Sequence, residues 1–275
     1  MAKIKLAALD VDGTLVKTDL SLSPAVLEAV QSLRDAGIEV AIVTGRNMGE
    51  LTCLREKLPW LRYFVVSNGA LALDAATGER FFQKMLPLEI ARAVEREARK
   101  YPVMTEVYAD DYSFVNLDRW EHSELYTAEF LHHPSLAVGR VPILSVGDFL
   151  AERQSDVEKL YISFQNPGDR IELQAYCEQF PVDLVTSIHD GLEVNQQGVE
   201  KGAGLAALCR YLGIAPEETA AIGDGMADVA MFRFAGLPIA MENAQDSVRR
   251  HAALVAPSND NDGVVWAIEQ IVSTR

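Results

Sequence analysis

The sequence predicts an α/β protein whose core is a doubly wound parallel sheet, with an inserted α+β domain. Three observations lead to this fold class. Strand-like and helix-like segments alternate over about the first 70 residues, the pattern becomes mixed near Phe82, and the first alternation returns at Lys201. Because such alternation is typical of parallel strands joined by helical crossovers, we expect the two outer parts to share one sheet.

The first elements are marked by short apolar runs and by helix start and stop signals. Ile4–Leu9 is nearly continuous in apolar residues, as expected for a strand buried on both faces. Ser23 is then a candidate N-cap, since proline follows it at the first helical position, and Gly37 ends that helix. The next expected elements are a strand at 38–43, a helix that ends near residue 57, and a strand at 63–66.

A mixed pattern occupies the middle of the chain. Val103–Ala109 and Tyr112–Asn116 predict a hairpin, because two alternating runs flank Asp110 and Asp111. The other expected elements are helices at 87–100 and 169–179, a strand at 160–164, and a hairpin of 182–187 with 192–195. Residues 130–156 give no readable pattern. We therefore expect a core of residues 1–82 and 191–275 and an inserted domain of residues 83–190.

The last part repeats the first pattern. Lys201–Leu212 predicts a helix, because Gly213 supplies a stop signal. The remaining expected elements are strands at 219–222, 237–240 and 253–255, and helices at 227–234, 245–250 and 263–272. Together with the N-terminal part, these elements give a Rossmann-like core.

The charge balance excludes some classes of partner. Lys and Arg number 25 against 40 Asp and Glu, a net charge of −15, whereas nucleic acids and anionic membranes need a basic face. No apolar run reaches the roughly 20 residues of a membrane span, and the N-terminal run is too short for a signal peptide. We expect a cytoplasmic protein that binds neither nucleic acid nor membrane, as a monomer or a weak homodimer.

Polar side chains follow several of the predicted parallel strands. Asp10 and Asp12 follow the first strand, Thr44 the second, Asn68 the third, and Asp224 the strand after Lys201. Ligands bind at the carboxyl edge of such sheets, where these strand ends converge. The competing interpretation of Asp10 and Asp12 is a strand-to-helix turn in which Asp serves as a cap.

The acidic residues among them predict a metal. Asp10, Asp12, Asp224 and Asp228 would raise one another's pKa if they met without a cation. Carboxylate oxygens in this number suit Mg²⁺, whose coordination a substrate phosphate completes.

Four motifs in this order resemble those of the haloacid dehalogenase-like superfamily of phosphohydrolases. They are Asp10-Val-Asp12-Gly-Thr-Leu, Thr44-Gly45-Arg46, Lys201-Gly202 and Gly223-Asp224-Gly225-Met-Ala-Asp228. Ser67-Asn68-Gly69-Ala70 and Asn243-Ala244 are similar to the Cof-type branch, whose large cap is inserted after the third core strand. The resemblance covers essentially the whole chain.

The resemblance implies a role for each motif residue. Asp10 would be the nucleophile and Asp12 the general acid and base. Thr44, Gly45 and Lys201 would hold the phosphoryl oxygens. Mg²⁺ would bind the Asp10 carboxylate, the Asp12 backbone carbonyl and Asp224, with Asp228 beside it or behind its ligands. Arg46, Asn68 and Asn243 are candidates for substrate contacts, with a salt bridge (Arg46) or a turn (the asparagines) as the competing interpretation.

Two residues depart from the family pattern. Ala227 stands where the family usually has Asn, and Glu200 precedes Lys201 where a small polar residue is common. We expect Glu200 to point outward at a helix N-terminus. The sequence thus predicts a Mg²⁺-dependent phosphatase of a small phosphorylated metabolite, such as a sugar phosphate. The alternatives are a phosphomutase and a metabolite-binding regulatory protein with weakened catalysis.

Overall fold

The computed structural model describes residues 2–126, 128–186 and 191–273, and the chain forms two compact units. The core unit consists of the residues up to Gly45, of Leu54–Gln83, and of the residues from Glu200 onward. The insert unit consists of Arg46–Cys53 and Lys84–Val199. Residues 46–53 and 191–199 differ from the expected boundaries, since the sequence placed them in the core. The core unit resumes at Glu200, whereas the sequence placed this boundary at residue 190, which lies outside the described residues.

The core sheet reverses its strand order at β1. In the described part of the chain the order is β14 (Leu254–Ala256), β13 (Leu237–Met241), β12 (Thr219–Gly223), β1 (Leu6–Leu9), β2 (Glu39–Val43), β3 (Tyr63–Val66), β4 (Leu71–Asp74) and β5 (Glu79–Gln83). The strands from β14 to β3 are parallel. The chain continues from β1 toward β2 on one side and returns at β12 on the other, which makes a doubly wound sheet with its switch point between β1 and β12.

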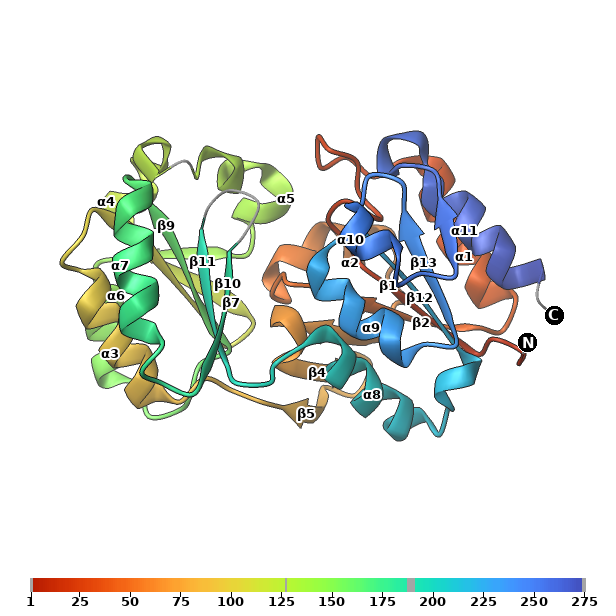
Figure 1. Ribbon diagram of the computed structural model, residues 1–275, viewed down its shortest axis with the longest axis horizontal. Coiled ribbons are helices and arrows are strands. Elements are labelled where there is room, and N and C mark those ends of the chain that lie inside the picture. The colour runs from red at the N-terminus through yellow and green to blue at the C-terminus, as the bar shows by residue number, and fades with distance from the viewer. Residues whose placement is uncertain (1, 127, 187–190, 274–275) are drawn as a thin grey trace. The chain divides into compact units, whose positions relative to one another are not determined.

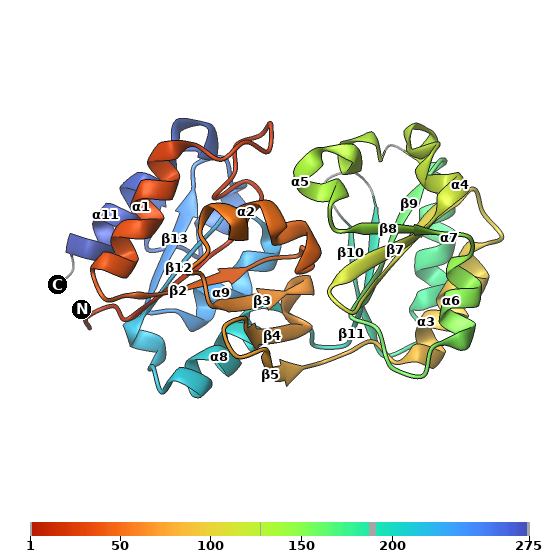
Figure 2. The same ribbon diagram turned by 180° about the vertical axis from the view of Figure 1, so that it is seen from behind.

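Helices cover both faces of this sheet. Leu6 and Ala8 of β1 pack with α8 (Lys201–Leu212) and α9 (Val229–Phe234). On the other face α1 (Pro24–Asp35) packs along α11 (Gly263–Ser273) (Figures 1 and 2). The short helix α10 (Asp246–Arg249) connects β13 to β14.

Two helix boundaries follow the predicted signals. The Ser23 side chain accepts a hydrogen bond from Val26 N at 3.2 Å, as an N-cap of α1 should. Gly213 ends α8 with a φ of 67°. The predicted fold class of the core is confirmed.

The sequence missed β4 and β5, which extend the core sheet as an antiparallel hairpin. The strand β5 lies at the edge and is largely exposed, so its residues lack the buried apolar pattern by which the other strands were recognised.

The insert unit contains a second sheet of mixed direction. In the described residues its order is β10 (Val182–Thr186), β11 (Leu192–Gln196), β9 (Lys159–Phe164), β6 (Val103–Ala109), β7 (Tyr112–Asn116) and β8 (Arg140–Ile143). All neighbours are antiparallel except β7 and β8. Both hairpins that the sequence predicted are present, whereas β8 lies in the stretch that gave no readable pattern.

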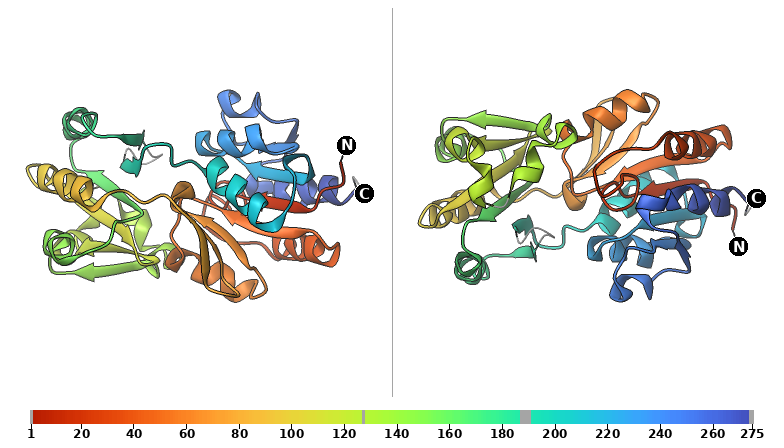
Figure 3. Two further views of the ribbon diagram at one scale, coloured as in Figure 1. Left: turned by 90° about the horizontal axis from the view of Figure 1, so that it is seen from below. Right: turned by 90° about the horizontal axis from the view of Figure 1, so that it is seen from above.

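The two faces of the insert sheet differ in character. One face packs against α3 (Leu88–Ala98), α6 (Val146–Glu152) and α7 (Pro167–Cys177) through apolar side chains (Figures 1 and 3). The other face carries Glu106, Tyr108 and Lys159 by strand alternation, and part of it is covered by the segment with Tyr126 and Leu131. The short helices α4 (Leu117–Trp120) and α5 (Pro134–Ala137) flank this segment.

Other short helical segments include η1 (Gly49–Leu51), α2 (Thr52–Lys57), η2 (Ser67–Gly69) and η6 (Met226–Asp228). Among the described residues, no helix combines the length and the apolar character needed to cross a membrane.

Candidate active site

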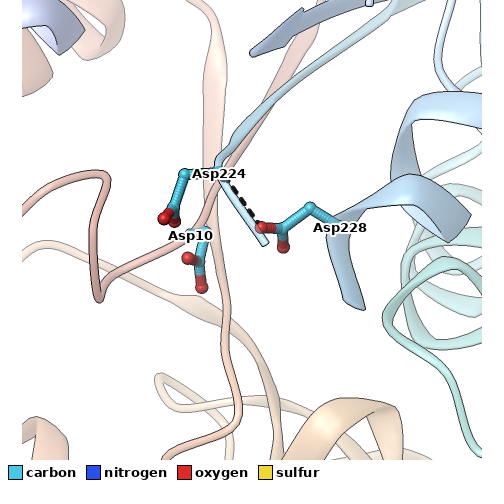
Figure 4. A group of neighbouring side chains, drawn as sticks. All are labelled: Asp10, Asp224 and Asp228. Atoms are coloured by element: carbon cyan, nitrogen blue, oxygen red, sulfur yellow. Dashed lines mark hydrogen bonds between the residues drawn. The ribbon is translucent and has the colours of Figure 1, made fainter. Parts of the chain in front are cut away.

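Asp10 and Asp224 meet at the switch point of the core sheet. Asp10 directly follows β1 and Asp224 directly follows β12, and these two strands pair in parallel. The pairing continues one step beyond the strands, since Asp10 N donates to Ile222 O at 3.0 Å. Figure 4 shows the two carboxylates close together, with Asp228, the residue before α9, reaching toward the same loop. The fold therefore brings together Asp10 and Asp224, which are more than 200 positions apart in the sequence.

The turn after Asp10 is shaped around Asp224. Gly13 has a φ of 73°, and a Cβ atom on it would lie 2.3 Å from Asp224 Oδ2. Thr14 Oγ1 donates to Asp224 Oδ1 at 3.2 Å, and Asn243 Nδ2 donates to Gly13 O at 2.9 Å and to Asp224 Oδ2 at 3.2 Å. Glycine is needed here both for its backbone conformation and for the space that the carboxylate occupies.

Lys201 places a buried cation between two carboxylates. Its Nζ lies 2.6 Å from Asp10 Oδ1 and 2.7 Å from Asp228 Oδ1, and all three side chains are buried. Lys201 is the first residue of α8, which approaches α9 closely at the next residue. A Cβ on Gly202 would lie 2.5 Å from Ala230 O, so the Lys-Gly pair allows the approach that brings Lys201 to the site.

Asp228 holds the loop that carries Asp224. Its Oδ2 accepts hydrogen bonds from the backbone N–H groups of Asp224 at 3.0 Å and of Gly225 at 2.8 Å, the first of which is drawn in Figure 4. Its Oδ1 accepts from Lys201. Because both oxygens are engaged by protein donors, Asp228 is placed to orient the loop and the lysine.

The site carries an excess of buried negative charge. Burial, and then the Asp228 charge, raise the pKa of Asp10, which Lys201 opposes. Burial and Asp228 likewise raise the pKa of Asp224 to about 6, with a smaller contribution from Asp12. Burial lowers the pKa of Lys201, but Asp10 and Asp228 more than offset this and raise it. One ammonium group therefore faces several carboxylates.

This arrangement fits a divalent cation. Asp10, Asp224 and Asp228 each offer a carboxylate oxygen, and these oxygens lie within 4.8 Å of one another. A hard cation such as Mg²⁺ binds oxygen ligands of this kind and would compensate the charge that raises the pKa values. Among the described residues the Asp12 side chain is outside this cluster and is exposed.

Thr44 and Gly45 lie beside Asn68 at the ends of β2 and β3. Thr44 N donates to Val65 O at 2.9 Å, and Asn68 N donates to Thr44 O at 3.0 Å. A Cβ on Gly45 would lie 2.8 Å from Asn68 Oδ1. Asn68 has a φ of 60°, an uncommon conformation for a residue other than glycine, at the turn that the sequence singled out.

Other predicted residues have structural partners. Arg46 is buried in the insert unit, where its Nη1 donates to Glu50 O at 3.3 Å and to Ser135 O at 3.5 Å. Asn243 braces the turn at Gly13 and, through Oδ1, accepts from Asn259 N at 3.1 Å. Glu200 is exposed at the N-cap of α8, as the outward orientation requires. Sequence reasoning missed Thr14, although it belongs to the first motif.

Gly13→Ala is expected to destabilise the protein and to weaken metal binding. A left-handed backbone conformation costs an L-residue about 1–2 kcal/mol, and the added methyl group would also displace the Asp224 carboxylate. Gly78→Ala is a matched control, because Gly78 has a φ of 76° with nothing within 4 Å of the added Cβ. Chemical denaturation with and without Mg²⁺ measures both effects. Equal losses in the two variants, with unchanged stabilisation by Mg²⁺, would contradict the role given to Gly13.

Comparison with known proteins agrees with this geometry. Residues 7–268 match the family of haloacid dehalogenase-like hydrolases. The 5-amino-6-(5-phospho-D-ribitylamino)uracil phosphatase YcsE of Bacillus subtilis is 29% identical over 98% of this chain and 96% of its own. The HMP-PP phosphatase of Cronobacter sakazakii is 27% identical over 87% of this chain and 85% of its own.

A solved structure gives the same result for the fold. The haloacid dehalogenase-like hydrolase from Bacteroides thetaiotaomicron superposes with a TM-score of 0.85 at 27% identity, over 98% of this chain and 100% of its own. This chain shares with that protein the α/β fold of its core, at whose switch point the Asp10 and Asp224 carboxylates lie. The chain belongs to the family of haloacid dehalogenase-like hydrolases.

Proposed function

We propose that this chain is a Mg²⁺-dependent phosphatase of a small phosphorylated metabolite, a sugar phosphate or a related phosphomonoester, with Asp10 as its nucleophile. The observation that carries the proposal is the Lys201 ammonium group, buried between Asp10 and Asp228 at the switch point of the sheet. A fixed cation there can attract the phosphoryl oxygens and leave the second Asp10 oxygen free to attack.

The reaction divides between two aspartates. Asp10 attacks the phosphorus and forms an aspartyl-phosphate while the ester oxygen leaves. Asp12 protonates that oxygen and then removes a proton from the attacking water. The exposure of Asp12, next to the buried Asp10, suits a group that must exchange protons with substrate and solvent. Thr44, Gly45 and Lys201 hold the phosphoryl oxygens.

The metal site would be formed by Asp10, Asp224 and the Asp12 backbone carbonyl. When bound, Mg²⁺ supplies positive charge that neutralises the phosphate and the carboxylates around it. The chain's own residues prepare this site: Thr14 and Asn243 orient the Asp224 carboxylate, and Asp228 holds the loop behind it.

The departure at Ala227 is compatible with activity. The amide that the family usually has there could have contacted the phosphate or held Asp228. In this chain Asp228 accepts hydrogen bonds from Lys201 and from two backbone N–H groups, and Ala227 is exposed. Asp228 is therefore positioned without an amide at residue 227, and this supports an enzyme more than a binding protein that has lost turnover.

The relatives support the substrate class. Two of them are named as phosphatases, one of a phosphoribityl compound and one of HMP-PP. Both names describe small phosphorylated molecules, and we extend this class to the present chain.

Phosphate release from a panel of sugar phosphates, phosphorylated sugar acids, nucleotides and phosphorylated cofactors tests the proposal. We expect release with Mg²⁺, a fall on the order of a hundredfold or more after chelation, and recovery when Mg²⁺ is restored. A product that keeps its phosphate would indicate a phosphomutase. Saturable binding of a compound without any release would indicate the binding protein.

A further inference from the structure

The segment Arg46–Cys53 links the two units in an unexpected way. It directly follows Thr44 and Gly45, and it leads into Leu54, which again belongs to the core unit. By its contacts, however, it is part of the insert unit. The backbone therefore passes between the units at residues 45–46 and 53–54, in addition to the passages at 83–84 and 199–200 that bound the rest of the insert.

A buried ionic network anchors this segment. Arg140 Nη1 lies 2.8 Å from Glu50 Oε1, and Arg140 Nε lies 2.8 Å from Glu106 Oε2. The three side chains, which we call the Arg140 network, are at most 2% exposed. Arg140 Nη1 also donates to Leu136 O at 2.9 Å. The guanidinium group of Arg140, in β8, thus joins Glu50 to Glu106, in β6.

The segment is also ordered internally and by backbone contacts. Asn47 N donates to Glu50 Oε2 at 3.0 Å, and Glu50 N donates to Asn47 Oδ1 at 2.9 Å. Gly49 N donates to Asp111 O at 2.8 Å. A Cβ on Gly139 would lie 2.4 Å from Glu50 Cγ, so Glu50 packs against the residue before β8 as closely as glycine permits. The two hydrogen bonds to Asn47 and the close packing on Gly139 therefore depend on where Glu50 is held.

Stability alone does not account for such a network. Two buried carboxylates share one guanidinium group, and among the described residues Glu106 Oε1 and Asn47 Nδ2 are buried without a hydrogen-bond partner. Replacing a buried ion pair with apolar side chains of similar volume is often neutral or stabilising, and in some proteins the role of such a pair is to specify one arrangement. The arrangement specified here is the attachment of residues 46–53 to the insert unit.

We propose that Arg140 is a positioning residue for the phosphate-binding residues Thr44 and Gly45. Through Glu50 it fixes the segment that begins one peptide bond after Gly45, so that the insert unit and the phosphate-binding residues are mechanically coupled. This inference rests on the proposed function, since it gives Thr44 and Gly45 their phosphate-binding role.

Arg140→Lys and Glu50→Gln test the coupling. Lysine reaches only one carboxylate and loses the forked geometry, and glutamine keeps the shape of Glu50 without its charge. Arg92→Lys is the matched control: Arg92 also makes several hydrogen bonds within the insert unit, to Leu150 O, Ala151 O and Arg153 O, but none to residues 46–53.

Two readouts are measured for each variant. Hydrogen exchange reports on the amides of Asn47, Gly49 and Glu50, which all donate hydrogen bonds in the structure. Inhibition by inorganic phosphate and the separate values of KM and kcat report on the phosphate-binding residues. We expect faster exchange in residues 46–53 with unchanged exchange in β6 and β9. We also expect phosphate to bind roughly 2- to 30-fold more weakly, a range typical of energetic coupling between distant sites.

Several outcomes would overturn the inference. Unchanged exchange in residues 46–53 would show that the network does not hold the segment. Faster exchange with unchanged phosphate inhibition and KM would show that the segment is held without consequence for the site. If Arg140→Lys loosens the whole insert, Glu50→Gln decides. The double variant must then bind phosphate no more weakly than the single variant that has the larger effect. Exchange and phosphate binding need no turnover, so failure of the proposed function remains distinguishable from failure of the coupling.

Discussion

Asp10→Asn is expected to lower phosphate release on the order of 10⁴-fold or more while leaving the fold intact. The amide cannot attack phosphorus as the carboxylate does, and loss of a covalent nucleophile is among the largest single-residue effects in enzymes. The side chain keeps its shape, and its oxygen can still accept the hydrogen bond from Lys201. Initial rates at saturating Mg²⁺, on the best ester of the panel, give the measurement.

A surface substitution of the same kind is the control for Asp10→Asn. Asp35 is exposed near the end of α1, where it accepts a hydrogen bond from Gln31, so Asp35→Asn makes the same chemical change far from the site. We expect Asp35→Asn to keep the parent rate. Retention of more than a tenth of the rate in Asp10→Asn, with mass spectrometry excluding reversion of the amide to aspartate, would remove Asp10 from the role of nucleophile.

Lys201→Met is expected to reduce both activity and stability. Removing one preorganised charge that faces the transferring group costs about a hundred- to a thousandfold in rate. In addition, the substitution leaves the Asp10 and Asp228 carboxylates buried without their cation. Breaking a buried ion pair in this way costs about 3–5 kcal/mol in the free energy of unfolding. Denaturant unfolding without Mg²⁺ and steady-state kinetics with Mg²⁺ measure the two losses separately.

A second substitution separates the structural from the catalytic role of Lys201. Asp228→Asn in the Lys201→Met background removes one of the unpaired carboxylates. We expect it to restore part of the lost stability but none of the activity. A double variant that recovers activity together with stability would mean that Lys201 acts only by holding the site together.

The site could be predicted from the sequence because its residues lie at strand ends. A parallel sheet aligns the carboxyl ends of its strands, so Asp10, Thr44 and Asp224 converge once the strands are recognised. Lys201 follows from the start of a helix that packs on the same sheet. The roles of these residues came from the family motifs, and their catalytic assignments stay predictions.

The missed features depend on contacts that leave no local pattern. Glu50 and Arg140 are 90 positions apart, and Arg140 lies in the stretch where the sequence shows no periodicity. Arg46 stays a candidate substrate contact, and its motif does not reveal that its side chain donates to two backbone carbonyls of the insert unit. Asn243 was recognised by its motif, whereas its bonds to Gly13 and Asp224 join three loops that are distant in sequence.

The assignment of Arg46–Cys53 to the insert unit also bears on how an insert can be exchanged between related proteins by recombination. Recombination that replaces residues 84–199 as one block would leave Glu50 facing a foreign partner in place of Arg140. A functional exchange would have to include the eight residues 46–53 as well, or use an insert that has an arginine at the position of Arg140. Residues 46–53 and residues 84–199 would then have to be exchanged together, and changes in residues 46–53 should be matched by changes in β8.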